Sequence, residues 1–338
     1  MTTLDFSDLK GLFSTEKKIL LTSHSNPDGD AIGSILALCQ FFELHGHKVF
    51  MAVPNHFPDF LDWMPGQEKI LIYERHKKKV DSLFKKSDII FALDYNGPAR
   101  IGDAKEQFIN SSAIKILIDH HIDPEKSAFD RVYSNINVSS TAELVFDLMH
   151  QLAPSLINES ISSCIYTGIM TDTGSFSYGC NYEKTFRIVA ELYKNGIDGV
   201  KINRLVYSTF SENRLRLLGY ALSQKLTVLE EFATAYIVLT KKELDSFNYQ
   251  VGDTEGLVNF ALSIKGIKLA VLFSERQNKI RVSFRSAGNF SVRNFALNHF
   301  EGGGHLNASG GDSYEPIDKT IENFHRLLSK YKDAIVNS

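Results

Sequence analysis

The sequence contains little cysteine, and this limits the chemistry that can be expected of it. Its three cysteines, Cys39, Cys164 and Cys180, form no CxxC pair and have no zinc-finger spacing. They support neither a disulfide framework nor a thiolate-rich metal site. We therefore expect them to be buried thiols in a protein of the reducing cytoplasm.

Long hydrophobic runs are absent too. No apolar stretch approaches the roughly 20 residues that cross a bilayer, and the opening MTTLDFSDLKGLF lacks the features of a secretory signal. We therefore expect a cytoplasmic protein with no membrane partner. The net charge of −3 argues against long duplex DNA as a partner. Basic residues concentrated locally could still attract a small or short anion.

What the sequence does contain is an alternation of strand-like and helical segments. Its 338 residues are long for a single core, so two domains are expected. In the first half, AIGSILALCQFFELHG is the first expected helix, and Gly46 is its expected stop. The expected strands are KKILLTS, KVFMAVP, KILIYE, DIIFALD and AIKILIDHH. This pattern predicts a doubly wound α/β fold with a mainly parallel sheet.

From residue 139 the pattern turns helical, and Ser140 and Glu143 have the spacing of a capping box. Beyond these helices, the sequence predicts a separate, smaller α/β domain. Strand-like segments return with KLTVLEE, ATAYIVLT, IKLAVLFSE and KIRVSFRS. We expect a first domain over residues 1–196, a helical connector over 197–225 and a second domain over 226–338, with the active-site cleft between the two domains.

Polar groups follow three of the expected strands at the point where each ends. His24 ends the first strand, Asp94 ends DIIFALD, and Asp119, His120 and His121 end AIKILI. Ligands of open α/β sheets bind beyond the carboxyl ends of the strands. Carboxylates that lie close together resist ionising at the same time unless a cation is present. The combination predicts a metal centre.

Each group has an ordinary structural alternative when it is taken alone. Asp28 or Asp30 in HSNPDGDAIGS could cap the helix that follows. Asp94 could be a turn residue, and the two adjacent histidines could be a structural pair. Capping does not readily explain why these groups occur together at successive strand ends.

Several motifs occur in an order that resembles the DHH phosphoesterase superfamily. They are HSNPDGDAIGS, LDYN, IDHH and IYTGIMTDTGSF, followed by VSFRS and EGGGHLNASGG. The second half resembles the DHHA1 domain of that superfamily. The nearest subgroup is the NrnA-type oligoribonucleases, which also act as phosphatases on 3′-phosphoadenosine 5′-phosphate (pAp). The resemblance covers nearly the whole chain and implies two divalent metal ions, with Mn²⁺ the expected ion.

The resemblance also implies roles for residues of the first domain. Six metal ligands are implied: His24 and Asp28 for one ion, Asp30, His120 and Asp172 for the other, and Asp94 bridging both. His121 is expected to contact the phosphate or to supply a proton. Asp119 is expected to orient an imidazole.

Substrate-binding residues are expected in the second domain. In KIRVSFRS, alternate residues are apolar, which predicts one packed face and one face that carries Arg281 and Arg285. Arg281 alone is expected to be a solvated strand residue. The resemblance implies that the substrate is bound by the RS and GGGH motifs: Arg285, Ser286, Gly303, Gly304 and His305.

The expected reaction is hydrolysis of RNA of about two to five nucleotides to 5′-mononucleotides, together with hydrolysis of pAp to AMP. One alternative is a phosphodiesterase specialised for the linear dinucleotides pGpG and pApA. The pyrophosphatase and RecJ branches are less expected, because the former fits the RS and GGGH motifs less well and the latter carries further binding domains. The sequence leaves the oligomeric state open.

A different class of function is a non-catalytic binder of single strands with a structural metal site. Four phenylalanines could then stack on bases: Phe284, Phe290, Phe295 and Phe300. Their place among periodic apolar residues favours core packing instead.

Overall fold

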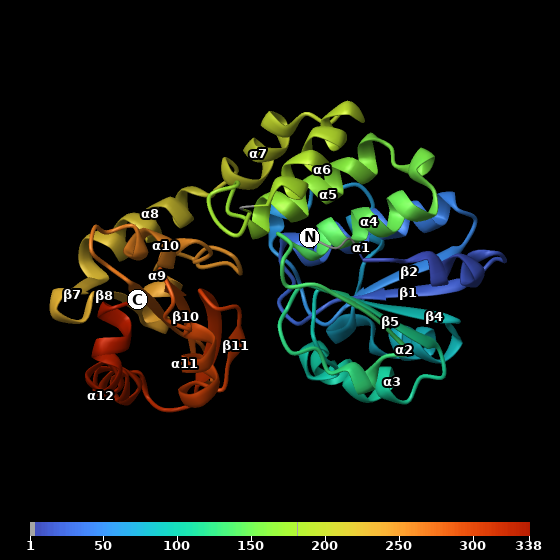
Figure 1. Ribbon diagram of the computed structural model, residues 1–338. Helices are drawn as coiled ribbons and strands as arrows, with labels where there is room; N and C mark the ends of the chain where they lie inside the picture. The colour runs from blue at the N-terminus through green and yellow to red at the C-terminus, as the bar shows by residue number, and fades with distance from the viewer. Residues whose placement is uncertain (1–3, 181) are drawn as a thin grey trace. The chain divides into compact units, whose positions relative to one another are not determined.

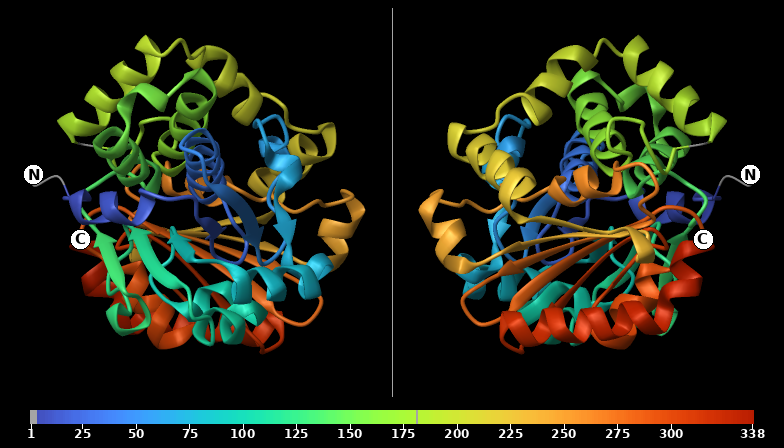
Figure 2. Two further views of the ribbon diagram at one scale, coloured as in Figure 1. Left: turned by 90° about the vertical axis from the view of Figure 1, so that its right-hand side faces the viewer. Right: turned by 90° about the vertical axis from the view of Figure 1, so that its left-hand side faces the viewer.

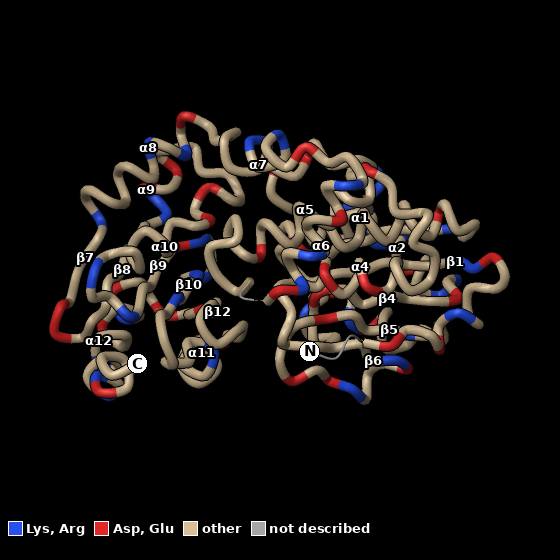
Figure 3. Tube along the Cα trace, turned by 45° about the horizontal axis from the view of Figure 1, so that its top comes forward, with Lys and Arg blue, Asp and Glu red and all other residues tan. Residues whose placement is uncertain are grey.

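The computed structural model describes residues 4–180 and 182–338. The chain divides into two compact units, one ending at Thr209 and one beginning at Phe210 (Figure 1). Within the described residues, no helix has both the length and the apolar character needed to span a membrane. Lys and Arg are interspersed with Asp and Glu in both units (Figure 3).

The first unit is built on a parallel sheet with the strand order β3-β2-β1-β4-β5-β6. Its strands are β1 (Lys18–Thr22), β2 (Lys48–Val53), β3 (Leu71–Ile72), β4 (Ile89–Leu93), β5 (Ile114–Asp119) and β6 (Arg131–Ser134). The predicted doubly wound parallel sheet is confirmed. The strand expected from KILIYE has only two residues, because Tyr73 already begins a helix. The short edge strand β6 was not predicted.

Helices cover both faces of this sheet. α1 (Gly29–Leu44), α4 (Thr141–Leu152) and α5 (Glu159–Asp172) lie on one face, and α2 (Tyr73–Lys86) and α3 (Lys105–Ile109) lie on the other (Figure 1). α6 (Glu183–Lys194) packs on α5, as does α7 (Gly199–Tyr207). After β1 the chain adds β2 and β3 on one side of β1. It then returns to add β4, β5 and β6 on the other side of β1. The carboxyl ends of β1 and β4 therefore form the switch point, where such folds bind ligands.

Three glycines allow α1, α4 and α5 to approach one another closely. A Cβ at Gly33 would lie 2.6 Å from the carbonyl oxygen of Cys164, and one at Gly168 would lie 2.6 Å from the Cβ of Ala142. A Cβ at Gly29 would lie 2.3 Å from a side-chain atom of Thr171. Larger residues would therefore force these helices apart.

The cysteines and the start of α4 bear on two sequence predictions. All three cysteines are free and buried, as predicted. Ser140 caps α4 by accepting a hydrogen bond from the amide of Glu143. The predicted capping box is only half formed, because the Glu143 carboxylate accepts from the backbone and hydroxyl of Ser139 instead.

The second unit contains a mixed sheet with the order β11-β12-β10-β9-β8-β7. Its strands are β7 (Leu226–Leu229), β8 (Thr234–Leu239), β9 (Leu269–Glu275), β10 (Ile280–Ser286), β11 (Gly303–Gly304) and β12 (Ala308–Ser313). Only the β8–β9 pair is parallel among the pairs described. β12 was not predicted, because ASGGDS shows no apolar alternation.

Two hydrophobic clusters flank this second sheet. α11 (Val292–His299) and α12 (Ile317–Val336) cover one face, and Figure 2 shows α12 lying along it. α8 (Glu212–Tyr220), α9 (Lys241–Ser246) and α10 (Leu257–Leu262) belong to the other face. The smaller α/β unit predicted from the sequence is confirmed.

The phenylalanines considered as stacking platforms lie in the core of this unit. Phe284, Phe290, Phe295 and Phe300 are all buried and belong to one cluster. Phe284 and Phe300 pack with their ring centroids 5.1 Å apart. Core packing, which the sequence favoured, is therefore correct for all four.

Candidate metal centre and phosphate-binding residues

The predicted ligands of the first unit converge because three neighbouring strands end together. His24 follows β1, Asp94 follows β4, and Asp119 is the last residue of β5. β4 pairs in parallel with both β1 and β5. The start of α1 supplies Asp28 and Asp30 at the same edge.

One group of potential ligand atoms comes from His24, Asp28 and Asp94, whose atoms lie within 4.8 Å of one another. The Nε2 atom of His24 is 3.3 Å from Oδ2 of Asp94, and its Nδ1 is 3.0 Å from the carbonyl oxygen of Ser25. A carbonyl oxygen only accepts hydrogen bonds, so Nδ1 carries the proton. In the neutral ring, Nε2 then directs a lone pair toward a carboxylate, an arrangement that suits a cation between them.

A second group comes from Asp30, His120 and Asp172, the last residue of α5. The Nε2 atom of His120 lies 3.9 Å from Oδ2 of Asp30 and 3.5 Å from Oδ2 of Asp172. The same nitrogen is 3.5 Å from Oδ1 of Asp94. Asp94 therefore directs one oxygen toward each imidazole.

Asp28 has a structural role in addition to its place among the potential ligands. Its Oδ1 accepts hydrogen bonds at 3.1 Å from the amides of Asp30 and Ala31, so it is the N-cap of α1. Asp30 lies in the first turn and is not the cap. Asp28 therefore caps α1 and also belongs to the first group of potential ligands.

Asp94 lies where the backbone turns sharply after β4. Its φ is +65°, in the left-handed region. Asp and Asn tolerate this conformation better than most residues, because their short polar side chains can hydrogen-bond locally. Its amide donates to the carbonyl of Ile118, which fixes this turn against β5.

Thr141, the first residue of α4, also contacts the central carboxylates and was not predicted from the sequence. Its amide donates to Oδ2 of Asp30 at 2.7 Å, and its hydroxyl donates to Oδ1 of Asp94 at 2.9 Å. The next amide, from Ala142, donates to Oδ1 of Asp30 at 2.8 Å. The only signal in the sequence is the run Ser-Ser-Thr before an apolar helix, which equally describes an ordinary helix start.

Burial raises the pKa of both central carboxyl groups well above the usual value for aspartate. For Asp30, the carboxylates of Asp94 and Asp28 raise the pKa further, while the two amides at the start of α4 lower it. For Asp94, burial again comes first, followed by nearby carboxylates, and the Thr141 hydroxyl opposes them. A nearby divalent cation would favour the ionised forms.

The residues present fit a divalent metal ion. The two groups together offer imidazole nitrogens and carboxylate oxygens, with Asp30 and Asp94 almost fully buried. Neither group contains a thiolate. Oxygen-rich sets of this kind suit Mn²⁺ and Mg²⁺ better than the thiolate-rich sets that favour zinc.

Asp119 and His121 form a pair beside these groups. The Nδ1 atom of His121 lies 2.7 Å from Oδ1 of Asp119, which is fully buried. The same nitrogen is 3.7 Å from Oδ1 of Asp94. The pairing with Asp119 fixes the orientation of the His121 ring.

In the second unit, the RS motif lies at the end of β10. Ile280, Val282 and Phe284 are buried, whereas Arg281 is exposed and Arg285 half-buried, as the alternation predicted. Arg285 pairs with Ala308 of β12 in the sheet register.

Ser286 ties this strand to the loop that carries His305. Its hydroxyl donates to the carbonyl of Phe290 at 2.7 Å and accepts from the Asn307 side chain at 3.0 Å. Its amide donates to the carbonyl of Asn307. The RS and GGGH motifs therefore lie side by side within this unit.

The GGGH glycines form a tight hairpin with β12. Gly304 has a φ of +140°, and a Cβ there would lie 2.6 Å from the carbonyl oxygen of Ala308. The turn closes through the His305 amide, which donates to the same carbonyl at 2.7 Å. A Cβ at Gly303 would meet nothing closer than 4.0 Å. Gly304 is thus required by the fold, while Gly303 leaves open space over its backbone.

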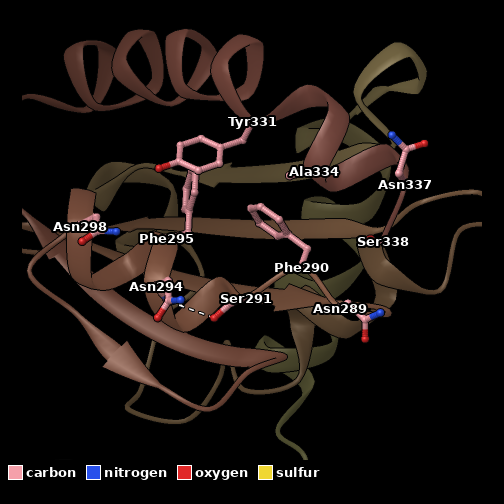
Figure 4. Close-up of a pocket in the computed structure, with 10 residues that line it drawn as sticks. All are labelled: Asn289, Phe290, Ser291, Asn294, Phe295, Asn298, Tyr331, Ala334, Asn337 and Ser338. Atoms are coloured by element: carbon pink, nitrogen blue, oxygen red, sulfur yellow. Dashed lines mark hydrogen bonds between the residues drawn. The ribbon is translucent and has the colours of Figure 1, made fainter.

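A cavity of about 540 Å³ lies between α11 and α12 (Figure 4). Phe290, Phe295 and Tyr331 form its aromatic part, and four asparagines surround them. The residues described as lining it include none of those predicted to bind substrate. The cavity is therefore separate from the RS and GGGH motifs.

Comparison with known proteins agrees with this arrangement. The model of the DHH family, N-terminal domain, matches residues 18–169, and that of the DHHA1 domain matches residues 230–337. The chain is 30% identical to the bifunctional oligoribonuclease and PAP phosphatase NrnA of Thermus thermophilus, over 88% of this chain and 85% of that protein. It is 27% identical to the protein of the same name from Bacillus subtilis, over 93% and 96% of the two chains.

A solved structure is similar over almost its whole length. It is that of an exopolyphosphatase-related protein from Bacteroides fragilis, which is 42% identical, with a TM-score of 0.92 and coverage of 97% of this chain and 96% of that one. The fold and the family matches define a hydrolase that acts on ester bonds. The chain belongs to the DHH phosphoesterase family, with a DHHA1 domain in its second half.

Proposed function

We propose that the protein is a cytoplasmic, Mn²⁺-dependent phosphoesterase that degrades RNA of about two to five nucleotides to 5′-mononucleotides and hydrolyses pAp to AMP. The relatives named as oligoribonuclease and PAP phosphatase support the substrate class. The observation that carries the proposal is the position of Asp94. Its two oxygens lie 3.3 Å from His24 and 3.5 Å from His120, so one carboxylate serves two imidazole–carboxylate groups.

In this proposal six side chains would hold two metal ions: His24 and Asp28 would hold one ion, Asp30, His120 and Asp172 the other, and Asp94 would contribute to both. When bound, a pair of such ions lowers the pKa of a water molecule and offsets the charge of the phosphate. The buried carboxylates of Asp30 and Asp94 provide the negative charge that attracts the cations.

His121 and Asp119 act on protons and phosphate oxygens rather than on the ions. Because Asp119 accepts from Nδ1 of His121 at 2.7 Å, the ring is held by that nitrogen. Nε2 is then the atom that contacts a phosphate oxygen or gives a proton to the leaving oxygen. The buried Asp119 carboxylate stabilises the protonated ring that this step requires.

The second unit binds the substrate. A guanidinium such as that of Arg285 binds phosphate oxygens in pairs, and the open space over Gly303 allows a close backbone approach. Ser286, Gly304 and Ser309 keep the His305 loop in place; the hydroxyl of Ser309 donates to the carbonyl of His305 at 3.0 Å. We assign metal chemistry to residues 1–196 and substrate binding to 226–338, joined by 197–225.

Single-turnover cleavage of an RNA ladder from 2 to 24 nucleotides in Mn²⁺, with pAp in parallel, tests the proposal. Efficiency should peak at two to about five nucleotides and fall steeply for the longest RNA, since tracking a long backbone requires many phosphate contacts. Equal or faster cleavage of the longest RNA would favour a RecJ-like activity. Cleavage restricted to two-residue substrates would favour the dinucleotide alternative. Binding of Mn²⁺ and RNA without turnover would favour the non-catalytic binder.

A further inference from the structure

We propose that Thr141 is a positioning residue of the metal centre, which holds the carboxylates of Asp30 and Asp94 in the orientation that binds cations. This inference rests on the proposed metal-dependent function. Thr141 is fully buried and lies in α4, whereas Asp30 belongs to α1 and Asp94 follows β4. One residue thus connects the two carboxylates, and neither is its neighbour in the sequence.

The contacts are made by groups that a helix leaves without partners at its start. The first amides of a helix have no intrahelical acceptor. Those of Thr141 and Ala142 donate to the two oxygens of Asp30 at 2.7 and 2.8 Å. The positive end of the helix dipole favours a carboxylate there. The carboxylate plane of Asp30 is therefore fixed by two hydrogen bonds.

The Thr141 hydroxyl performs the same task for Asp94. It donates to Oδ1 at 2.9 Å, and Oδ2 of the same carboxylate lies 3.3 Å from His24. A carboxylate oxygen can accept about two hydrogen bonds or ligands, so this donor leaves capacity for a cation. The hydroxyl orients the carboxylate without occupying the position of an ion. A β-branched side chain also has few rotamers, which keeps the hydroxyl in place.

A buried polar network holds the segment before Thr141 in place. Glu143 is fully buried, and its Oε2 accepts from the hydroxyls of Ser139 and Thr185, both at 2.8 Å. Lys184 lies 3.6 Å from the other oxygen of Glu143 and forms an ion pair with Asp147. These contacts fix the start of α4, and with it Thr141.

Three variants separate a positioning role from a purely structural one. Thr141→Val removes only the hydroxyl and keeps the amide to Asp30, whereas Thr141→Ser keeps both donors. Thr234→Val is the matched control, because Thr234 of β8 is buried in the second unit and its hydroxyl donates to the carbonyl of Phe232. Mn²⁺ binding to the full-length metal-free proteins is measured by titration calorimetry, and folding by the melting temperature.

We expect Thr141→Val to weaken Mn²⁺ binding by about 10- to 100-fold, the usual effect of losing a group that orients a ligand. Thr141→Ser and Thr234→Val should bind as the wild type does. If Thr141→Val and the wild type bind Mn²⁺ equally, the positioning role is wrong while the proposed function stands. Should Thr141→Val not fold, Thr141→Ala, which also removes the hydroxyl and keeps the amide, takes its place: weakened Mn²⁺ binding by the folded protein would support the role, and unchanged binding would refute it. If the wild type itself binds no Mn²⁺, the proposed function fails.

Discussion

The imidazole of His24 and the carboxylate of Asp94 lie 3.3 Å apart although the residues are separated by 70 positions. The register of the sheet explains this contact. Thr22 of β1 pairs with Ala92 of β4, and His24 and Asp94 each follow two residues later. Two neighbouring parallel strands thus carry the two groups past the same edge of the sheet. The pair is a direct consequence of strand order.

Replacing Asp94 tests whether it serves both ligand groups. We expect Asp94→Asn to lose more activity in Mn²⁺ than the about 10- to 100-fold that follows loss of a supporting residue. Asn is preferred to Ala here, because Asn tolerates the left-handed backbone of position 94. Activity and metal content of the folded variant are measured together. A folded Asp94→Asn protein with wild-type turnover would contradict the assignment.

The stabilities of Asp94→Asn and the wild type should differ by an amount that depends on pH when no metal is bound. The folded pKa of Asp94 is raised by burial and by neighbouring carboxylates. Between the unfolded and the folded pKa, the folded protein binds the additional proton, so the stability due to this group falls as pH rises from about 4. In EDTA, Asp94→Asn should therefore melt at a higher temperature than the wild type at pH 7, and at a similar temperature near pH 4. A difference in melting temperature between the two proteins that does not change with pH would contradict the raised pKa of Asp94 as its cause.

Removing Glu243 should destabilise the second unit. Burial alone would raise the pKa of Glu243, but hydrogen bonds from Lys225, Tyr220 and Thr240 outweigh it and lower the pKa to about 2. A depressed carboxyl pKa stabilises the fold at neutral pH, and this contribution is lost as pH falls toward that value. We expect Glu243→Gln to lower the free energy of unfolding by roughly 1–3 kcal/mol at pH 7, and by less at pH 3.

Urea denaturation of the full chain at both pH values measures this effect. Glu231→Gln is the control, since Glu231 is exposed and lies 3.4 Å from Lys332. Its loss should cost less than about 1 kcal/mol. A Glu243→Gln deficit that is equal at pH 7 and pH 3 would show that charge is not the cause.

Arg285 and His305 should affect substrate capture without affecting metal content. Loss of one charge-assisted phosphate contact costs about 1.5–3 kcal/mol, so kcat/KM for short RNA should fall by about 10- to 150-fold in Arg285→Ala or His305→Ala. Arg281→Ala is the control, because Arg281 is exposed and pairs with Asp312 at 3.3 Å. Loss of bound Mn²⁺ from either variant, measured by elemental analysis, would refute the division of labour between the units.

The sequence could predict the groups that stand at strand ends, because an apolar strand followed by Asp or His is a local pattern. It could not predict Thr141. Its bond to Asp30 joins residues 111 positions apart and arises from the packing of α4 on α1. β12 was missed for a related reason. The segment ASGGDS pairs with β10 through its backbone, which requires no apolar alternation.

The close approach of α1, α4 and α5 also sets limits on the size of an ion. A Cβ at Gly168 would lie 3.0 Å from Oδ1 of Asp30, so the position of this carboxylate depends on how tightly the helices meet. Calcium prefers oxygen ligands at 2.3–2.6 Å and magnesium at 2.0–2.1 Å. Shifting the Asp30 carboxylate to suit a larger cation would require these packed helices to move, which cores resist. Discrimination by ionic radius would then depend in part on glycines, which have no side chain to offer as a ligand.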